Sequence, residues 1–269
     1  MIVNKAVQPK KERLDKLVHD QGLAESRSRA QALILAGVVY VNGQKSTKAG
    51  VLIPSDAKIE LQGMPIPYVS RGGLKLEAAL KGFNINPQGW VCGDIGASTG
   101  GFTDCLLQNG AAKVYAVDVG YGQLDVKLRN DPRVIVMEKV NARYLDIQQI
   151  QETLDLVTID VSFISLKLVI PAITPLLKPG GYLLALVKPQ FEAGRKEIDK
   201  GSGVIRDPVI RKAILDDIRN FTTHIGYHLL GDMESPVHGP SGNVEFLLWA
   251  RYQGPGENQL SSMEKTPIS

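Results

Sequence analysis

From residue 69 onward, short apolar runs alternate with stretches whose apolar residues recur at helical spacing. The runs predict buried strands over 89–96, 113–120, 133–138, 154–162, 181–189, 228–235 and 243–252. The periodic stretches predict helices over 70–83 with Ser70 as the cap, 101–109, 123–129, 147–153, 165–177 and 207–224. Repeated β-α-β units of this kind predict an α/β fold with a doubly wound, mainly parallel sheet.

The first 62 residues show a different pattern of predicted helices and strands. Leu14, Leu17 and Val18 stand at helical spacing in a stretch from residue 11 to Gly22, and Ser26 is placed to cap a second helix that ends near Gly37. An Asn-Gly pair at 42–43 predicts a hairpin, and 57–61 predicts a further strand. We therefore expect a small α/β domain over 11–62, a proline-containing linker over 63–69, the larger domain over 70–252 and a loose polar tail over 253–269.

Composition agrees with a globular chain. The sequence is 43% hydrophobic and 22% charged, and no apolar run approaches the ~20 residues that a membrane-spanning helix needs. The N-terminus lacks the apolar core of a secretory signal, so we expect a cytoplasmic protein. Cys92 and Cys105 have neither CxxC spacing nor a neighbouring histidine, which predicts buried apolar side chains and no metal site.

Charge is spread unevenly along the chain. Residues 1–62 hold ten lysines and arginines against six acidic residues, whereas residues 63–269 hold 21 against 22. A compact basic domain joined to a near-neutral body predicts a polyanionic partner. The basic side chains on the two predicted helices are Arg13, Lys16, Arg27 and Arg29.

The segment GDIGASTGGFTD, residues 93–104, joins the first strand of the larger domain to its next helix. Serine replaces the middle glycine of a G-x-G-x-x-G motif, which argues against a nicotinamide dinucleotide. Asp118 ends the next strand, where a carboxylate can accept hydrogen bonds from both hydroxyls of a ribose. Asn141 follows the third strand, where an amide could form hydrogen bonds with the edge of an adenine. The pattern favours a site for S-adenosylmethionine over a site for a nicotinamide cofactor, and over a turn that serves packing alone. The expected cofactor-binding residues are Asp94, Gly96, Ser98, Gly100, Gly101, Phe102, Asp118 and Asn141.

The residues after the fourth and fifth strands indicate which atom would receive a methyl group. The fourth is followed by Asp160 without the Asn/Asp-Pro-Pro-aromatic motif of amine-directed enzymes or the cysteine of carbon-directed ones. Lys188 follows five apolar residues, and an ammonium without a partner is costly to bury. Near carboxylates and a second cation such as Lys75, burial would leave some neutral amine to take a proton from a hydroxyl. Glu245 lies in the last predicted strand.

Several motifs together carry a family resemblance. They are RLDKLV, GLAESRSRAQALILAGVVYVNGQ, SRGGLKLEAAL, DIGASTGGFTDCLLQNGAAKVYAVDVG, VKPQFEAGR, GVIRDP and GPSGNVEFLL. With them the chain resembles the TlyA-type, haemolysin A-like family, in which an S4 RNA-binding domain is fused to a Rossmann-like, FtsJ-like ribose 2′-O-methyltransferase domain. Thr99 stands where the FtsJ pattern has proline, as in the TlyA branch.

The resemblance implies a Lys-Asp-Lys-Glu tetrad of Lys75, Asp160, Lys188 and Glu245, with Lys188 as the base. It also implies ribosomal RNA or a ribosomal subunit as substrate, with the four basic residues of the small domain contacting phosphates. Two other classes stay open: an S4-type RNA-binding or assembly factor without turnover, and a haemolysin acting on membranes. We find no amphipathic segment for the latter and expect no membrane partner. The sequence does not indicate the modified nucleotide or the oligomeric state.

Overall fold

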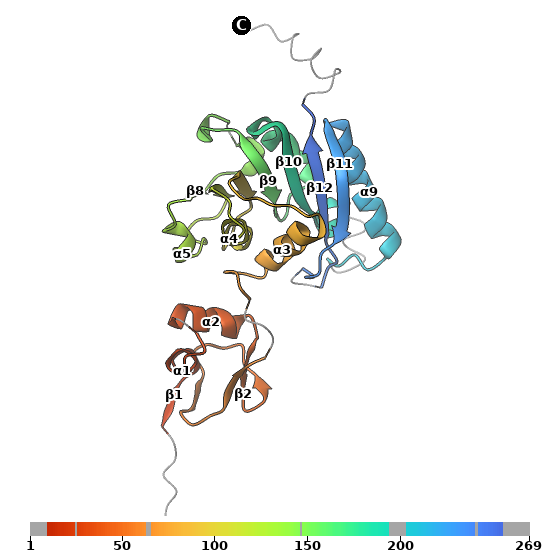
Figure 1. Ribbon diagram of the computed structural model, residues 1–269. Helices are drawn as coiled ribbons and strands as arrows, with labels where there is room; N and C mark the ends of the chain where they lie inside the picture. The colour runs from red at the N-terminus through yellow and green to blue at the C-terminus, as the bar shows by residue number, and fades with distance from the viewer. Residues whose placement is uncertain are drawn as a thin grey trace, which may run out of the picture. The chain divides into compact units, whose positions relative to one another are not determined.

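The computed structural model describes residues 10–24, 26–62, 66–145, 147–193, 203–239 and 242–254. The chain forms two compact units, Met1–Pro67 and Tyr68–Ser269 (Figure 1). Residues 255–269 of the predicted tail lie outside the described residues.

The N-terminal unit contains two helices and two small antiparallel sheets. Strand β1 pairs with β4, and the second sheet has the order β3-β2-β5. The elements are β1 Lys11–Arg13, α1 Leu14–Asp20, α2 Arg27–Leu35, β2 Val39–Val41, β3 Gln44–Lys45, β4 Leu52–Pro54 and β5 Ile59–Leu61.

The predicted helix cap and hairpin turn of this unit are confirmed, whereas one predicted helix boundary is not. The hydroxyl of Ser26 accepts from the backbone N–H of Arg29 at 3.1 Å and so caps α2. Asn42 and Gly43 both have positive φ, as a tight hairpin turn between β2 and β3 requires. The predicted start of the first helix at residue 11 is wrong, because residues 11–13 form β1 and pair with β4.

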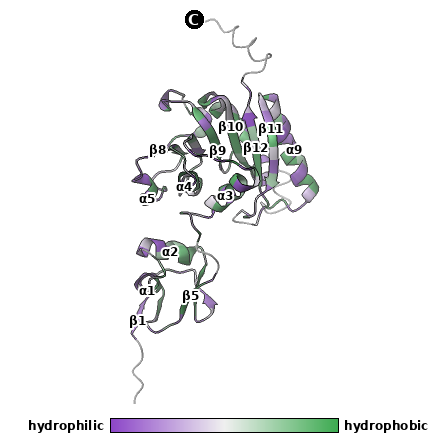
Figure 2. Ribbon diagram, viewed as in Figure 1, coloured by the Kyte–Doolittle hydropathy of each residue, from purple (hydrophilic) through white to green (hydrophobic). Residues whose placement is uncertain are grey.

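The two helices of this unit cover one apolar core. Figure 2 shows how α2 changes from hydrophilic residues at its start to hydrophobic residues farther along. Leu14, Val18, Ala30, Ile34 and Val39 are fully buried and belong to the same cluster. Burial of this apolar stripe supplies the main force that holds the helices on the small sheets.

The larger unit is built on a seven-stranded sheet with the order β11-β12-β10-β9-β6-β7-β8. Strands β6 to β10 run parallel, and β12 is antiparallel to both β10 and β11. This confirms the predicted doubly wound, mainly parallel sheet. Its strands are β6 Val91–Ile95, β7 Lys113–Asp118, β8 Val134–Glu138, β9 Leu154–Ile159, β10 Leu177–Val187, β11 Tyr227–Glu234 and β12 Phe246–Tyr252.

The helices of this unit differ from the prediction in several places. They are α3 Gly72–Gly82, α4 Gly101–Gln108, α5 Val126–Arg129, α6 Leu166–Ile173, α7 Pro189–Glu192 and α9 Pro208–His224, with 3₁₀ turns at Ala142–Tyr144, Ile147–Gln149 and Thr174–Leu176. The predicted helix over 147–153 is therefore a single 3₁₀ turn, the helix over 123–129 is only four residues long, and the helix over 165–177 ends at Ile173. Strand β10 starts four residues earlier than predicted.

The predicted cap of α3 is also wrong. Arg71 occupies the capping position, and its side chain makes no capping hydrogen bond. Ser70 instead lies against the start of α4, since a Cβ added to Gly101 would stand 2.3 Å from the Ser70 Oγ. The glycines at the starts of α3 and α4 thus let the two helices approach closely.

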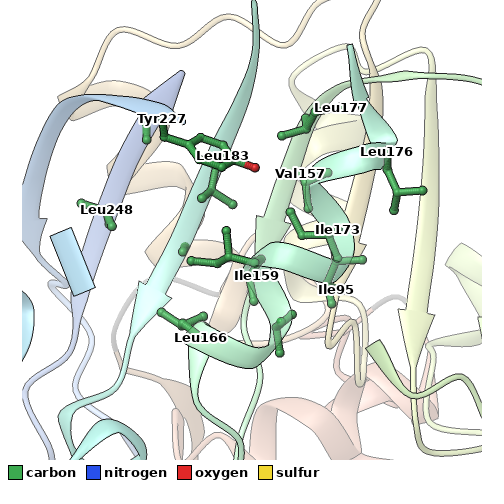
Figure 3. Close-up of a cluster of buried hydrophobic side chains, with 14 of the residues drawn as sticks. Ile95, Val157, Ile159, Leu166, Ile173, Leu176, Leu177, Leu183, Tyr227 and Leu248 are labelled. Carbon is green, nitrogen blue, oxygen red and sulfur yellow. The ribbon is translucent and has the colours of Figure 1, made fainter. Parts of the chain in front are cut away.

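Helices α6 and α9 pack against the sheet through a continuous apolar core, part of which is drawn in Figure 3. From α6, Leu166 and Ile173 reach the core, and from the strands Ile95, Val157 and Ile159 meet them. Leu215 and Ile218 of α9 belong to the same cluster, and α9 runs beside β11 in Figure 1. The core fixes the strand positions, and with them the loops at the strands' carboxyl ends.

Candidate active site

The glycine loop after β6 approaches the loop after β9 very closely. Gly96 has φ +85°, and a Cβ there would stand 2.5 Å from the backbone oxygen of Asp160. Gly100 has φ +94°, and a Cβ there would stand 2.2 Å from a methyl carbon of Leu128. Both positions therefore require glycine. Ser98 takes a left-handed conformation as well, with φ +49°.

Asp94 is fully buried in β6 under this loop. Its Oδ2 accepts from the Thr103 backbone N–H at 2.9 Å and from the Thr103 hydroxyl at 2.6 Å, and Thr158 donates to Oδ1 at 3.3 Å. Burial raises the pKa of Asp94 to about 7, although the hydrogen bonds oppose this shift. The carboxyl group ties the start of α4 to the sheet.

This pKa makes stability depend on pH. The pKa of Asp94 rises from 3.8 to about 7 on folding. The contribution of the Asp94 carboxyl group to the free energy of unfolding is therefore complete below pH ~4 and is lost as pH rises through about 7. Asp94→Asn has no proton to release at this position. From pH ~5 to pH ~8 we expect the wild type to lose about 3 kcal/mol of unfolding free energy relative to Asp94→Asn, measured by urea denaturation. Parallel pH profiles of the two proteins would contradict this assignment.

Asp118 ends β7 beside the glycine loop. Its Oδ2 accepts from the Ser98 backbone N–H and its Oδ1 from the Gly120 backbone N–H, each at 2.7 Å. Each carboxylate oxygen keeps a further lone pair for a ligand hydroxyl. Asn141 follows β8 and caps the next turn by accepting from the Arg143 backbone N–H at 3.0 Å.

A cavity of about 530 Å³ lies at the carboxyl ends of β6, β7, β8 and β9. Its volume falls within the range of small-molecule sites. The residues that border it are Gly96, Ser98, Val117, Asp118, Val119, Gln123, Val140, Asn141, Ala142, Asp160, Val161, Ser162, Phe163 and Ile164. Backbone and polar groups of the glycine loop thus meet an apolar wall, an arrangement suited to a nucleoside.

A second cavity of about 330 Å³ borders Gly96, Ser98, Asp160 and Ser162 as well, so the two spaces adjoin. It contains every member of the predicted tetrad. Lys75 from α3 and Lys188 from the end of β10 line it together with Asp160 and Glu245. Asp94, Gly101 and Phe102 border it too.

The tetrad forms two ion pairs. Lys75 Nζ lies 2.6 Å from Glu245 Oε2, and Lys188 Nζ lies 2.5 Å from Asp160 Oδ1. Both lysine side chains are only 10% exposed, so each charge is balanced where water is scarce. Glu245 directly precedes β12, whose residue Phe246 pairs with Val187, and this register brings Glu245 beside Lys188.

This arrangement changes one expectation. The sequence suggested that the charge of Lys75 would act on Lys188 as a second cation. Glu245 offsets that charge, and Asp160 directly contacts the Lys188 ammonium. The effect of Lys75 on Lys188 is therefore smaller than the sequence indicated.

The structure brings together most of the predicted site residues but not all of them. Gly100 borders neither cavity and instead meets Leu124 and Leu128. Arg13, Lys16, Arg27 and Arg29 belong to the N-terminal unit.

Several side chains of the site were missed. Ser162 accepts from Lys188 Nζ at 3.0 Å, and Gln190 donates to Glu245 Oε1 at 3.4 Å. Phe163 borders the larger cavity; the residue is 90% exposed and has φ +65°. These residues lie three or four positions after the ends of β9 and β10, so their place after a strand was the available signal.

In the part of the chain that the structure describes, no helix combines the length and apolar character that crossing a bilayer requires. Cys92 and Cys105 are buried free thiols, as predicted. Burial raises the pKa of Cys105 to about 12, which leaves it unreactive at neutral pH.

Comparison with known proteins gives a consistent result. The profile of the FtsJ-like methyltransferase family matches residues 68–252, and that of the S4 domain matches residues 12–59. A Bacillus subtilis protein named "Putative rRNA methyltransferase YqxC" is 49% identical over 249 residues, which cover 92% of this chain and 88% of the relative. A Mycobacterium tuberculosis protein named 16S/23S rRNA (cytidine-2′-O)-methyltransferase TlyA is 44% identical over 90% of each chain.

Solved structures agree with this. A structure titled "Putative hemolysin from Streptococcus thermophilus" has 45% sequence identity and a TM-score of 0.73, and the match covers 93% of this chain and 90% of that one. The agreement extends through both units of the chain. The chain therefore belongs to the TlyA-type family, in which an S4 domain precedes an FtsJ-like methyltransferase domain.

Proposed function

We propose that the protein transfers a methyl group from S-adenosylmethionine to a ribose 2′-oxygen of ribosomal RNA. The observation that carries the proposal is the pair of buried lysine-carboxylate contacts lining one cavity next to a second, nucleoside-sized cavity. Relatives named as rRNA (cytidine-2′-O)-methyltransferases support the choice of acceptor.

The larger cavity fits the cofactor. Asp118 has lone pairs left for the ribose hydroxyls, and Asn141 lies where an amide can meet the adenine edge. Gly96 borders both cavities, and its lack of a side chain lets the glycine loop lie against Asp160. Ser98, Gly101 and Phe102 border the smaller cavity, on the side proposed for the methionine portion. Asp94 holds this loop from beneath through Thr103. S-adenosylmethionine supplies an electrophilic methyl group when bound.

Lys188 is proposed as the general base for the acceptor hydroxyl. Asp160 and Ser162 hold its Nζ in position, and the cavity that they border admits the hydroxyl to the same place. The proposed step requires Lys188 as a neutral amine, which would take the proton from the 2′-hydroxyl. The oxygen would then bond to the methyl carbon while the methyl–sulfur bond of the donor breaks and S-adenosylhomocysteine leaves. Lys75, held by Glu245, places a positive charge near the developing oxyanion.

A transfer assay tests the proposal against an RNA-binding factor without turnover. The purified chain is incubated with S-adenosylmethionine labelled in its methyl group and with naked ribosomal RNA or either ribosomal subunit. We expect labelled RNA in at least one of these reactions. RNA binding without label in any of them would contradict the proposed enzyme and favour the assembly factor.

A further inference from the structure

The N-terminal unit buries one carboxylate beneath two of its basic side chains. Asp15 on α1 is 0% exposed. Arg13 donates to it through Nε at 3.0 Å and Nη2 at 2.9 Å, Arg27 through Nη2 at 3.2 Å, and Gln31 through Nε2 at 2.7 Å. A buried carboxylate is costly unless it is paired, and Asp15 has four donors. The Arg13 guanidinium is the main reason that the pKa of Asp15 lies well below its usual range.

The same contacts fix the two arginines. The side chains of Arg13 and Arg27 are 49% and 51% exposed, so part of each guanidinium faces solvent while another part is bound to Asp15. Gly50 leaves room on one side, since a Cβ there would stand 3.3 Å from Arg13 Nη1. A guanidinium has five N–H donors, and these contacts use two from Arg13 and one from Arg27. The remaining N–H donors of the two guanidinium groups can reach phosphate oxygens.

Lys16 provides a contrast on the same helix. Its ammonium contacts Glu12 and lies 3.0 Å from Asp20, and both partners are at least partly exposed. Such surface pairs at i,i+4 spacing form and break at little cost. Lys16 is therefore held much less firmly than Arg13 and Arg27.

We propose that Asp15 is a positioning residue for RNA recognition, which orients the guanidinium groups of Arg13 and Arg27 toward phosphates of the RNA. This inference rests on the proposed function. Free arginine side chains lose conformational entropy when they bind, and arginines already held by a buried carboxylate lose less. Asp15 thus contributes to RNA affinity although its own negative charge repels the phosphates of the RNA.

The sign of the effect separates this role from simple electrostatics. Removing a negative charge near a phosphate-binding surface should tighten RNA binding if charge alone matters. Asp15→Asn should weaken it instead, by about tenfold, because two long side chains must then be ordered on binding. Asp20→Asn removes the same charge from the same helix without touching either arginine, and its RNA affinity should be unchanged or higher.

The test uses the full chain and an in vitro transcript of ribosomal RNA, with dissociation constants measured by filter binding at one fixed salt concentration. Asp15→Asn is also made in an Arg13→Ala/Arg27→Ala background, where we expect no further loss. Thermal melting and circular dichroism verify the fold of each variant. If Asp15→Asn fails to fold, Arg13→Lys takes its place: it keeps the charge but loses the two-point contact, so it should also weaken binding.

Unchanged or tighter binding by Asp15→Asn would overturn the positioning role, as would an equal loss in the background that lacks both arginines. If the double arginine variant loses affinity while Asp15→Asn does not, the positioning role fails and the proposed function stands. Absence of RNA binding by the wild type would instead contradict the proposed function itself.

Discussion

Replacing Lys188 with alanine is expected to lower the rate of methyl transfer by about a thousandfold, within the range that a general base contributes. Cofactor affinity should change little, because Lys188 does not border the larger cavity proposed for the nucleoside portion of the cofactor, and its amine is held by Asp160 and Ser162. Single-turnover rates with saturating RNA and cofactor measure the first effect. Isothermal titration calorimetry with S-adenosylmethionine measures the second.

Two further variants separate the role of Lys188 from its charge. Lys188→Arg keeps a cation beside Asp160 but cannot be deprotonated, so it should be as slow as the alanine variant. Lys178→Ala removes an exposed lysine from the same strand, one that pairs with Asp155 away from both cavities, and should keep the full rate. A Lys188→Ala protein with wild-type turnover would show that the assigned base is wrong.

Gly96→Ala is expected to cause the second large loss, of more than about tenfold in cofactor affinity together with most of the activity. Its new Cβ would stand 2.5 Å from the backbone oxygen of Asp160, so the loop that carries Asp160 must shift. The left-handed conformation adds roughly 1–2 kcal/mol of strain. Equilibrium titration with S-adenosylmethionine measures the change.

Gly89→Ala is the matched control for the backbone strain. Gly89 has φ +76°, and a Cβ there would meet nothing within 4 Å. This variant should lose stability but bind the cofactor as the wild type does. Equal cofactor affinities for Gly96→Ala and Gly89→Ala would contradict this prediction, because they would show that the contact with Asp160 does not affect cofactor binding.

The central strands were the most predictable part of the fold. Runs such as VYAV in β7 and LLALV in β10 are apolar on both faces because helices cover both faces of a parallel sheet. Polar segments were less predictable: the stretch over 147–153 has glutamines where a buried helix needs apolar residues, and it forms only a 3₁₀ turn. Residues 11–13 gave no local sign of pairing with β4, some 40 positions later.

The site could be predicted in outline. Asp118 ends a parallel strand, and Asn141, Asp160 and Lys188 follow three others, so the fold alone brings them to one edge of the sheet. Their partners could not be predicted in the same way. Lys75 and Glu245 are 170 residues apart, and their contact depends on the antiparallel register of β12 against β10. That register depends on which positions of two strands far apart in the sequence are buried together, and neither strand alone indicates it.

Asp15 shows a similar limit in the N-terminal unit. Its place among Leu14, Leu17 and Val18 gives no sign that it is buried, and an aspartate on a helix is usually exposed. Only the folded unit brings Arg27 and Gln31 of α2 to the same carboxylate.

The most direct test of the central claim identifies the methylated atom. Ribosomal RNA methylated by the purified protein is digested to nucleosides, and mass spectrometry locates the added methyl group on the ribose or on the base. A hydroxyl held beside Lys188 and Asp160 predicts a 2′-O-methylated nucleoside, absent from reactions with Lys188→Ala. A methyl group on a base nitrogen or carbon would contradict the account.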